Sequence, residues 1–129
     1  MLGVGLLALA IADQGWTLEY ERSGYVRTGR YAEAVTYCEQ LAKASPYARV
    51  LRFGTSPEGR EMVALLISKE RKFKEDEVRK SRKPFVFVLN GIHSGEIEGK
   101  DASLILARNL LVMGKEDKIL EGANLVIVP

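Results

Sequence analysis

The sequence has too little cysteine to support a disulfide framework or a cysteine-based metal site. Its 129 residues include one cysteine, Cys38, so no internal disulfide can form. Cys38 lies in a stretch with helical apolar spacing, where a buried thiol is the usual outcome. The chain also has a single histidine, His93. His93 is therefore the one residue of this sequence that can supply an imidazole as a metal ligand or as an acid or base.

The chain also lacks a strong charge of either sign. Its 19 Lys and Arg residues against 17 Asp and Glu residues give a formal net charge of +2. Basic and acidic residues alternate along the chain, without the basic face that a nucleic-acid-binding protein presents. We therefore expect no nucleic-acid partner. The apolar content of 47% and the charged content of 28% are typical of a globular domain.

No apolar run in the sequence reaches the length of about 20 residues that crosses a bilayer. The run at residues 2–12 has the length of a signal-peptide core and ends with Ala10, Ile11 and Ala12, a small-residue pattern that suits cleavage. No Lys or Arg precedes it, and a buried helix is the alternative. We expect a signal peptide at residues 1–12, a secreted or periplasmic protein, and no stable membrane anchor.

Apolar spacing divides the first two thirds of the chain into a lead-in segment, a helix and a hairpin. Residues 13–30 have no clean period and predict a partly packed arm. Ala34, Cys38 and Leu41 share one face of a helix predicted over residues 31–44, which Pro46 ends. Two β-prone segments at residues 49–53 and 62–68 flank a turn sequence and predict a hairpin or neighbouring strands. Residues 69–83 are dense in charge and predict a solvated loop or an exposed helical turn.

The final third of the sequence indicates a strand, a helix and a strand. Residues 85–89 form a continuous apolar run, which predicts a strand covered on both faces. A helix follows from about residue 96 to residue 113, with Ala102, Ile105, Leu106 and Leu110 on one face, and residues 124–128 form another buried strand. The fold class is α/β: an α/β/α sandwich around a mixed, mostly parallel sheet. Because a central strand at the chain's end would lack neighbours, we expect residues 31–129 to be the N-terminal part of a larger domain.

His93 and Glu96 lie between the predicted strand and its helix, where α/β proteins bind ligands. With His93 ending the loop and Glu96 opening the helix, a ring nitrogen and a carboxylate oxygen can meet at one cation, about 2 Å from each. A structural interpretation fits equally well: His93 would hydrogen-bond the loop and Glu96 would complement the helix N-terminus. These residues alone leave both interpretations open.

A family resemblance favours the metal. The sequence NGIHSGE at residues 90–96, followed by GKDA at residues 99–102, resembles the first zinc-binding motif of the M14 metallocarboxypeptidases, the carboxypeptidase A-like peptidases. Upstream, FGTSPEGR at residues 53–60 resembles that family's approach to the motif. The likeness covers residues 22–129 and is similar in particular to secreted bacterial members. It implies that His93 and Glu96 bind one catalytic Zn²⁺ whose third protein ligand, a histidine, is missing from this chain.

The resemblance also implies an activity, hydrolysis of C-terminal peptide bonds by metal-activated water. The substrate would be a peptide or a peptide-like molecule. The general base and the groups that hold the substrate carboxylate are expected downstream, so this chain has no catalytic residue and the fragment alone is inactive. Digestive members have arginine where Gly95 stands. Glu98 and Asp101 are candidates to orient a metal ligand.

Two alternatives to the peptidase remain. An aspartoacylase-like zinc deacylase uses the same arrangement of His and Glu, although the GKDA sequence at residues 99–102 counts against it. A vestigial binding domain that keeps the fold without the chemistry is the other, and the single histidine motivates it.

Overall fold

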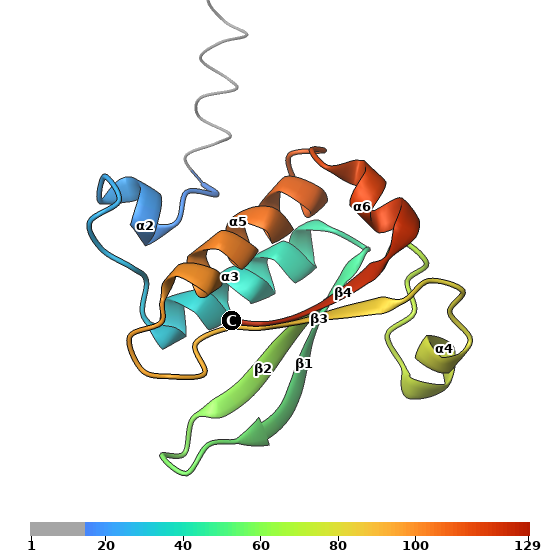
Figure 1. The fold of residues 1–129 in the computed structure, drawn as a ribbon, viewed down its shortest axis with the longest axis horizontal. Helices are drawn as coiled ribbons and strands as arrows, with labels where there is room; N and C mark the ends of the chain where they lie inside the picture. Colours follow the sequence, from blue (N-terminus) through green and yellow to red (C-terminus); the bar gives the residue numbers. More distant parts are fainter. Residues whose placement is uncertain (1–14) are drawn as a thin grey trace, which may run out of the picture.

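The computed structural model describes residues 15–129, so the predicted signal peptide at residues 1–12 lies outside the described residues. The elements in chain order are α2 (Glu19–Arg22), α3 (Tyr31–Ala44), β1 (Ala48–Thr55), β2 (Glu61–Ile67), α4 (Glu75–Arg79), β3 (Phe85–Leu89), α5 (Glu98–Leu111), α6 (Asp117–Gly122) and β4 (Asn124–Val128). The helices α3 and α5 lie side by side over one face of the sheet (Figure 1). No helix in the described range has the length and apolar character needed to cross a membrane.

The sheet has the strand order β1-β2-β4-β3. β2 pairs antiparallel with both β1 and β4, and β4 pairs parallel with β3. The predicted α/β class with a mixed sheet is confirmed, but the described sheet is less parallel than the sequence indicates. β4 has neighbours on both sides, because the β1–β2 hairpin folds back beside it. The expectation that the last strand would lack neighbours is therefore wrong.

The predicted hairpin is confirmed as β1 and β2, joined by the turn at residues 56–60. The backbone amide of Ser56 donates to the carbonyl of Arg60 at 2.8 Å, which closes the turn. Gly59 has φ +79, a conformation that glycine adopts with little strain. A bulge between Arg52 and Gly54 interrupts the ladder near this turn.

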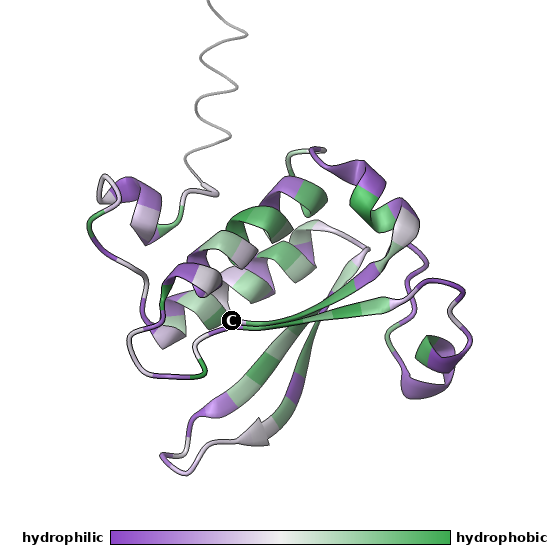
Figure 2. Cartoon of the chain, in the orientation of Figure 1, coloured by the Kyte–Doolittle hydropathy of each residue, from purple (hydrophilic) through white to green (hydrophobic). Residues whose placement is uncertain are grey.

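The hydrophobic core lies between the sheet and the helices α3 and α5. α3 has the predicted bounds and buries Ala34, Tyr37, Cys38 and Leu41. Apolar residues dominate β3 and β4, whereas they alternate with polar residues on the two helices (Figure 2). Burial raises the pKa of the Cys38 thiol to about 12, so this thiol is a core side chain, as predicted.

The buried face of α5 differs in part from the predicted one. Ala102 is exposed, whereas Leu110 is buried as predicted and Ile105 and Leu106 are partly buried against the core. Leu104 and Ala107 are buried as well, together with two charged residues, Asp101 and Arg108. Each has an ion-pair partner, Lys100 for Asp101 and Glu21 for Arg108, and such a partner offsets the cost of burying charge.

β3 also differs from its prediction of coverage on both faces. Its side chains Val86, Phe87 and Leu89 are 45%, 61% and 48% exposed. β3 is an edge strand of the described sheet, and the helices α3 and α5 cover the opposite side of the layer (Figure 1). The apolar run at residues 85–89 therefore predicts the strand correctly but not its coverage on both faces.

The predicted lead-in arm packs against the helices and contains the single turn α2. Leu18 is buried, and the Trp16 ring meets the Tyr37 ring edge to face at a centroid distance of 6.2 Å. Arg108 Nη1 of α5 donates to the Trp16 carbonyl at 3.1 Å and to Glu21 Oε2 at 2.6 Å. The arm is thus fixed to α5 by polar as well as apolar contacts.

Candidate metal centre

The candidate site is the loop of residues 90–97, which connects the end of β3 to the start of α5. Gly91 and Gly95 have φ of +60 and +95, a region that side-chain-bearing residues rarely adopt. Within the loop, the amide of Glu96 donates to the carbonyl of His93 at 3.2 Å. The chain therefore turns sharply between residues 93 and 96. An arginine in place of Gly95 would strain this backbone.

The turn brings the side chains of His93 and Glu96 together. His93 Nδ1 lies 3.0 Å from Glu96 Oε1, and the His93 backbone amide donates to Glu96 Oε2 at 3.2 Å. The two side chains are 78% and 58% exposed, so an ion from solvent can reach both. The pair that the sequence singles out is thus adjacent and accessible.

The pair fits two of the donors that a zinc ion takes. Imidazole nitrogen and carboxylate oxygen are both common zinc ligands, and two ligands about 2.1 Å from a tetrahedral ion lie about 3.4 Å apart. The Nδ1 to Oε1 separation of 3.0 Å is close to that value. In residues 15–129, no group of three or more His, Cys, Asp or Glu side chains is placed to hold a metal. The described residues therefore bring together two side chains of the kinds that bind zinc.

Glu96 does not cap α5. The helix begins at Glu98 with Ile97 as its N-cap, and no side chain hydrogen-bonds the cap. The Glu96 carboxylate faces back toward His93 instead. The helix start expected at residue 96 thus lies two residues later, at Glu98, and Glu96 belongs to the loop.

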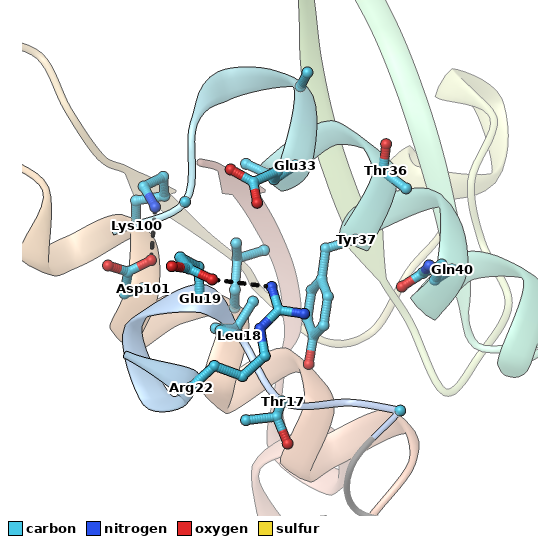
Figure 3. Close-up of a pocket in the computed structure, with 15 residues that line it drawn as sticks. Thr17, Leu18, Glu19, Arg22, Glu33, Thr36, Tyr37, Gln40, Lys100 and Asp101 are labelled. Carbon is cyan, nitrogen blue, oxygen red and sulfur yellow. Dashed lines mark hydrogen bonds and ion pairs between the residues drawn. The ribbon is translucent and has the colours of Figure 1, made fainter. Parts of the chain in front are cut away.

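Asp101, a candidate to orient a metal ligand, contacts Lys100 and Thr28 instead. Asp101 pairs with Lys100 Nζ at 2.6 Å and accepts a hydrogen bond from the Thr28 hydroxyl at 2.7 Å. Figure 3 shows this ion pair at the edge of a pocket of about 320 Å³ between α2, α3 and α5. Asp101 therefore holds the lead-in arm. Glu98, the other candidate, is exposed at the start of α5.

Sequence reasoning missed Asn90, which connects the loop to its surroundings. Its Nδ2 donates to the Ser103 hydroxyl and to the Val128 carbonyl, both at 2.9 Å. Gly99 gives Asn90 room: a Cβ at that position would lie 2.6 Å from Asn90 Oδ1. The available signal was the glycine at position 99 inside the predicted helix, because such a glycine often has a packing reason.

Comparisons with known proteins agree with this geometry. The family model Peptidase M14, zinc carboxypeptidase, matches residues 34–129. Carboxypeptidase A from Helicoverpa armigera is similar to the chain with a TM-score of 0.66 and 26% identity, over 78% of this chain and 24% of that one. A metallo-carboxypeptidase from Burkholderia cenocepacia shares the fold with a TM-score of 0.62 and 20% identity, over 78% of this chain and 26% of that one. The chain thus spans about a quarter of the length of these structures. No curated protein matches it significantly.

Proposed function

The chain belongs to the M14 family of zinc carboxypeptidases, and from this membership we propose that the full-length protein is a metallocarboxypeptidase. Its substrate would be a peptide or a peptide-like molecule, cleaved at the C-terminal bond. The observation that carries the proposal is the contact of His93 Nδ1 with the Glu96 carboxylate, in the loop that follows β3 and within the matched region.

In this proposal His93 and Glu96 hold one zinc ion. Bound zinc polarises a carbonyl group and activates water for hydrolysis. The ring nitrogen of His93 is one ligand of the ion. The Glu96 carboxylate is the other, and its negative charge partly neutralises the ion. A third protein ligand, the general base and the groups for the substrate carboxylate are assigned to the part of the family domain that these residues do not span.

The comparisons favour the peptidase over the alternatives. The matching model is that of a carboxypeptidase, and the similar structures carry the same designation, so a deacylase has less support. A vestigial domain is disfavoured because the two ligand side chains keep an arrangement that fits zinc. Export to the periplasm or beyond the cell is part of the proposal, supported by the apolar run at residues 2–12.

The test uses the full-length protein. We expect one zinc ion per molecule and hydrolysis of a blocked dipeptide, and we expect both to be lost in the variant His93→Ala, Glu96→Ala. Glu121→Ala, which removes an exposed carboxylate on α6, is the matched control and should keep both. A wild-type protein without zinc would overturn the proposal. Faster cleavage of an N-acylated amino acid than of the dipeptide would favour the deacylase.

A further inference from the structure

We propose that Asn90 is a positioning residue that fixes the loop carrying His93 and Glu96, and so sets the separation of the two ligands. This inference rests on the proposed zinc site. It assigns to Asn90 no contact with the metal or with the substrate. Asn90 acts by fixing the backbone of residues 91–97.

Asn90 joins three elements at the base of the loop. It directly follows β3, and its backbone amide donates to the Val128 carbonyl at 3.0 Å, extending the ladder with β4. Its side-chain Nδ2 donates to the same carbonyl and to the Ser103 hydroxyl of α5. Residue 90 precedes the loop and Ser103 follows it, so one side chain ties the two ends of the loop together.

The loop has few other attachments. All residues from 91 to 99 are exposed, and the hydrogen bonds that involve residues 91–96 run within the loop itself. When both ends of a loop are fixed, its side chains keep the same orientation relative to one another. If the ends separate, the two ligands lose their common orientation, and a misplacement of about 1 Å already costs much of a site's function.

Gly99 supports the same assignment independently. It is not among the glycines with positive φ, so its backbone conformation does not require glycine. Alanine is a better helix former than glycine, so a glycine in the first turn of α5 needs another reason. An added Cβ would meet Asn90 Oδ1 at 2.6 Å, a distance at which one group has to move. The glycine therefore preserves the position of the Asn90 side chain.

The test is a double-mutant cycle in the full-length protein, with zinc affinity measured by competition with a chelator. We expect Asn90→Ala and Gly99→Ala each to weaken zinc binding about tenfold, the low end of the range for residues that orient ligands. The double variant should bind no more weakly than Asn90→Ala alone, because the shortened side chain at position 90 leaves room for the new Cβ. Gly122→Ala, at a helical glycine with nothing near its Cβ, is the control and should leave affinity unchanged.

Melting of the metal-free variants separates positioning from general stability. A lowered melting temperature with wild-type zinc affinity would show a structural role only and overturn the inference. Additive losses in the double variant would also overturn it. If Asn90→Ala does not fold, Ser103→Ala removes one acceptor of Nδ2 and decides the question through a smaller loss of affinity. A wild type that binds no zinc would instead refute the proposed function itself.

Discussion

At the scale of single residues, Glu70 has the most perturbed carboxylate of the described chain. The hydroxyl of Ser81 donates to Glu70 Oε2, Asn124 Nδ2 lies 3.4 Å from the same oxygen, and Lys72 Nζ lies 3.2 Å from Oε1. The hydrogen bond from Ser81, assisted by those from Asn124 and Lys72, lowers the pKa of Glu70 to about 2. The carboxylate thereby ties the charged loop of residues 69–83 to the start of β4.

The lowered pKa makes the contribution of Glu70 dependent on pH. A carboxylate with a pKa of about 2 in the folded state and 4.5 otherwise stabilises the fold above about pH 4.5, and this stabilisation disappears as the pH falls toward about 2. We expect Glu70→Gln to be less stable than the wild type near neutral pH and equal to it near pH 2. Denaturant unfolding across this range measures the difference, with exposed Glu121→Gln as control. A deficit that stays constant down to about pH 2 would contradict the assignment.

The sequence predicted the exposure of this loop but not its attachment. Dense charge at residues 69–83 indicates a solvated segment, and most of it is exposed. The partners of Glu70 lie 11 and 54 residues away, and no local pattern connects positions so far apart. The same contrast holds at the candidate site. His93 and Glu96 are three residues apart and were found, whereas Asn90 reaches Val128 across 38 residues and was not.

At the scale of elements, α5 shows why buried charge misleads a prediction from periodicity. Helix α3 and the strands follow local apolar patterns, and their positions were predicted. The buried face of α5 depends on Arg108, whose partner Glu21 is 87 residues away. A single sequence contains no sign of this pair, and the apolar residues alone placed Ala102 on the buried face and left out Leu104 and Ala107.

The pair of Arg108 and Glu21 gives a prediction for the attachment of the lead-in arm. Both side chains are largely buried, and removing one partner leaves the other charge without compensation. We expect Arg108→Ala in the full-length protein to lower the free energy of unfolding by about 3 kcal/mol, at the low end for a buried pair. The double variant Arg108→Met, Glu21→Leu should recover part of this loss, because it buries no unpaired charge. Urea unfolding measures both, and an Arg108→Ala variant as stable as the wild type would contradict the anchoring role.

At the scale of the whole molecule, the described chain has one covered and one exposed side of the sheet. Besides Phe87 and Leu89 of β3, Leu51, Phe53 and Met62 of the hairpin are 47%, 46% and 40% exposed. Exposed apolar side chains on this scale mark a surface that another part of a protein or another molecule covers. The chain matches only about a quarter of each of these similar structures, so the rest of a full-length protein of this kind can provide such a cover.

The exposed β3 edge predicts how residues 1–129 behave when they are produced alone. A strand with unpaired backbone groups on one side and exposed apolar side chains is a template for pairing with another chain. We expect concentration-dependent self-association, measured by sedimentation velocity, and we expect Phe87→Lys to reduce it because a charge on an edge strand opposes such pairing. Val26→Lys replaces an even more exposed apolar side chain on the lead-in arm and should have little effect, since that segment offers no strand. A monomeric chain with a cooperative melt at every concentration would contradict the prediction and would mean that this sheet face is stable in water.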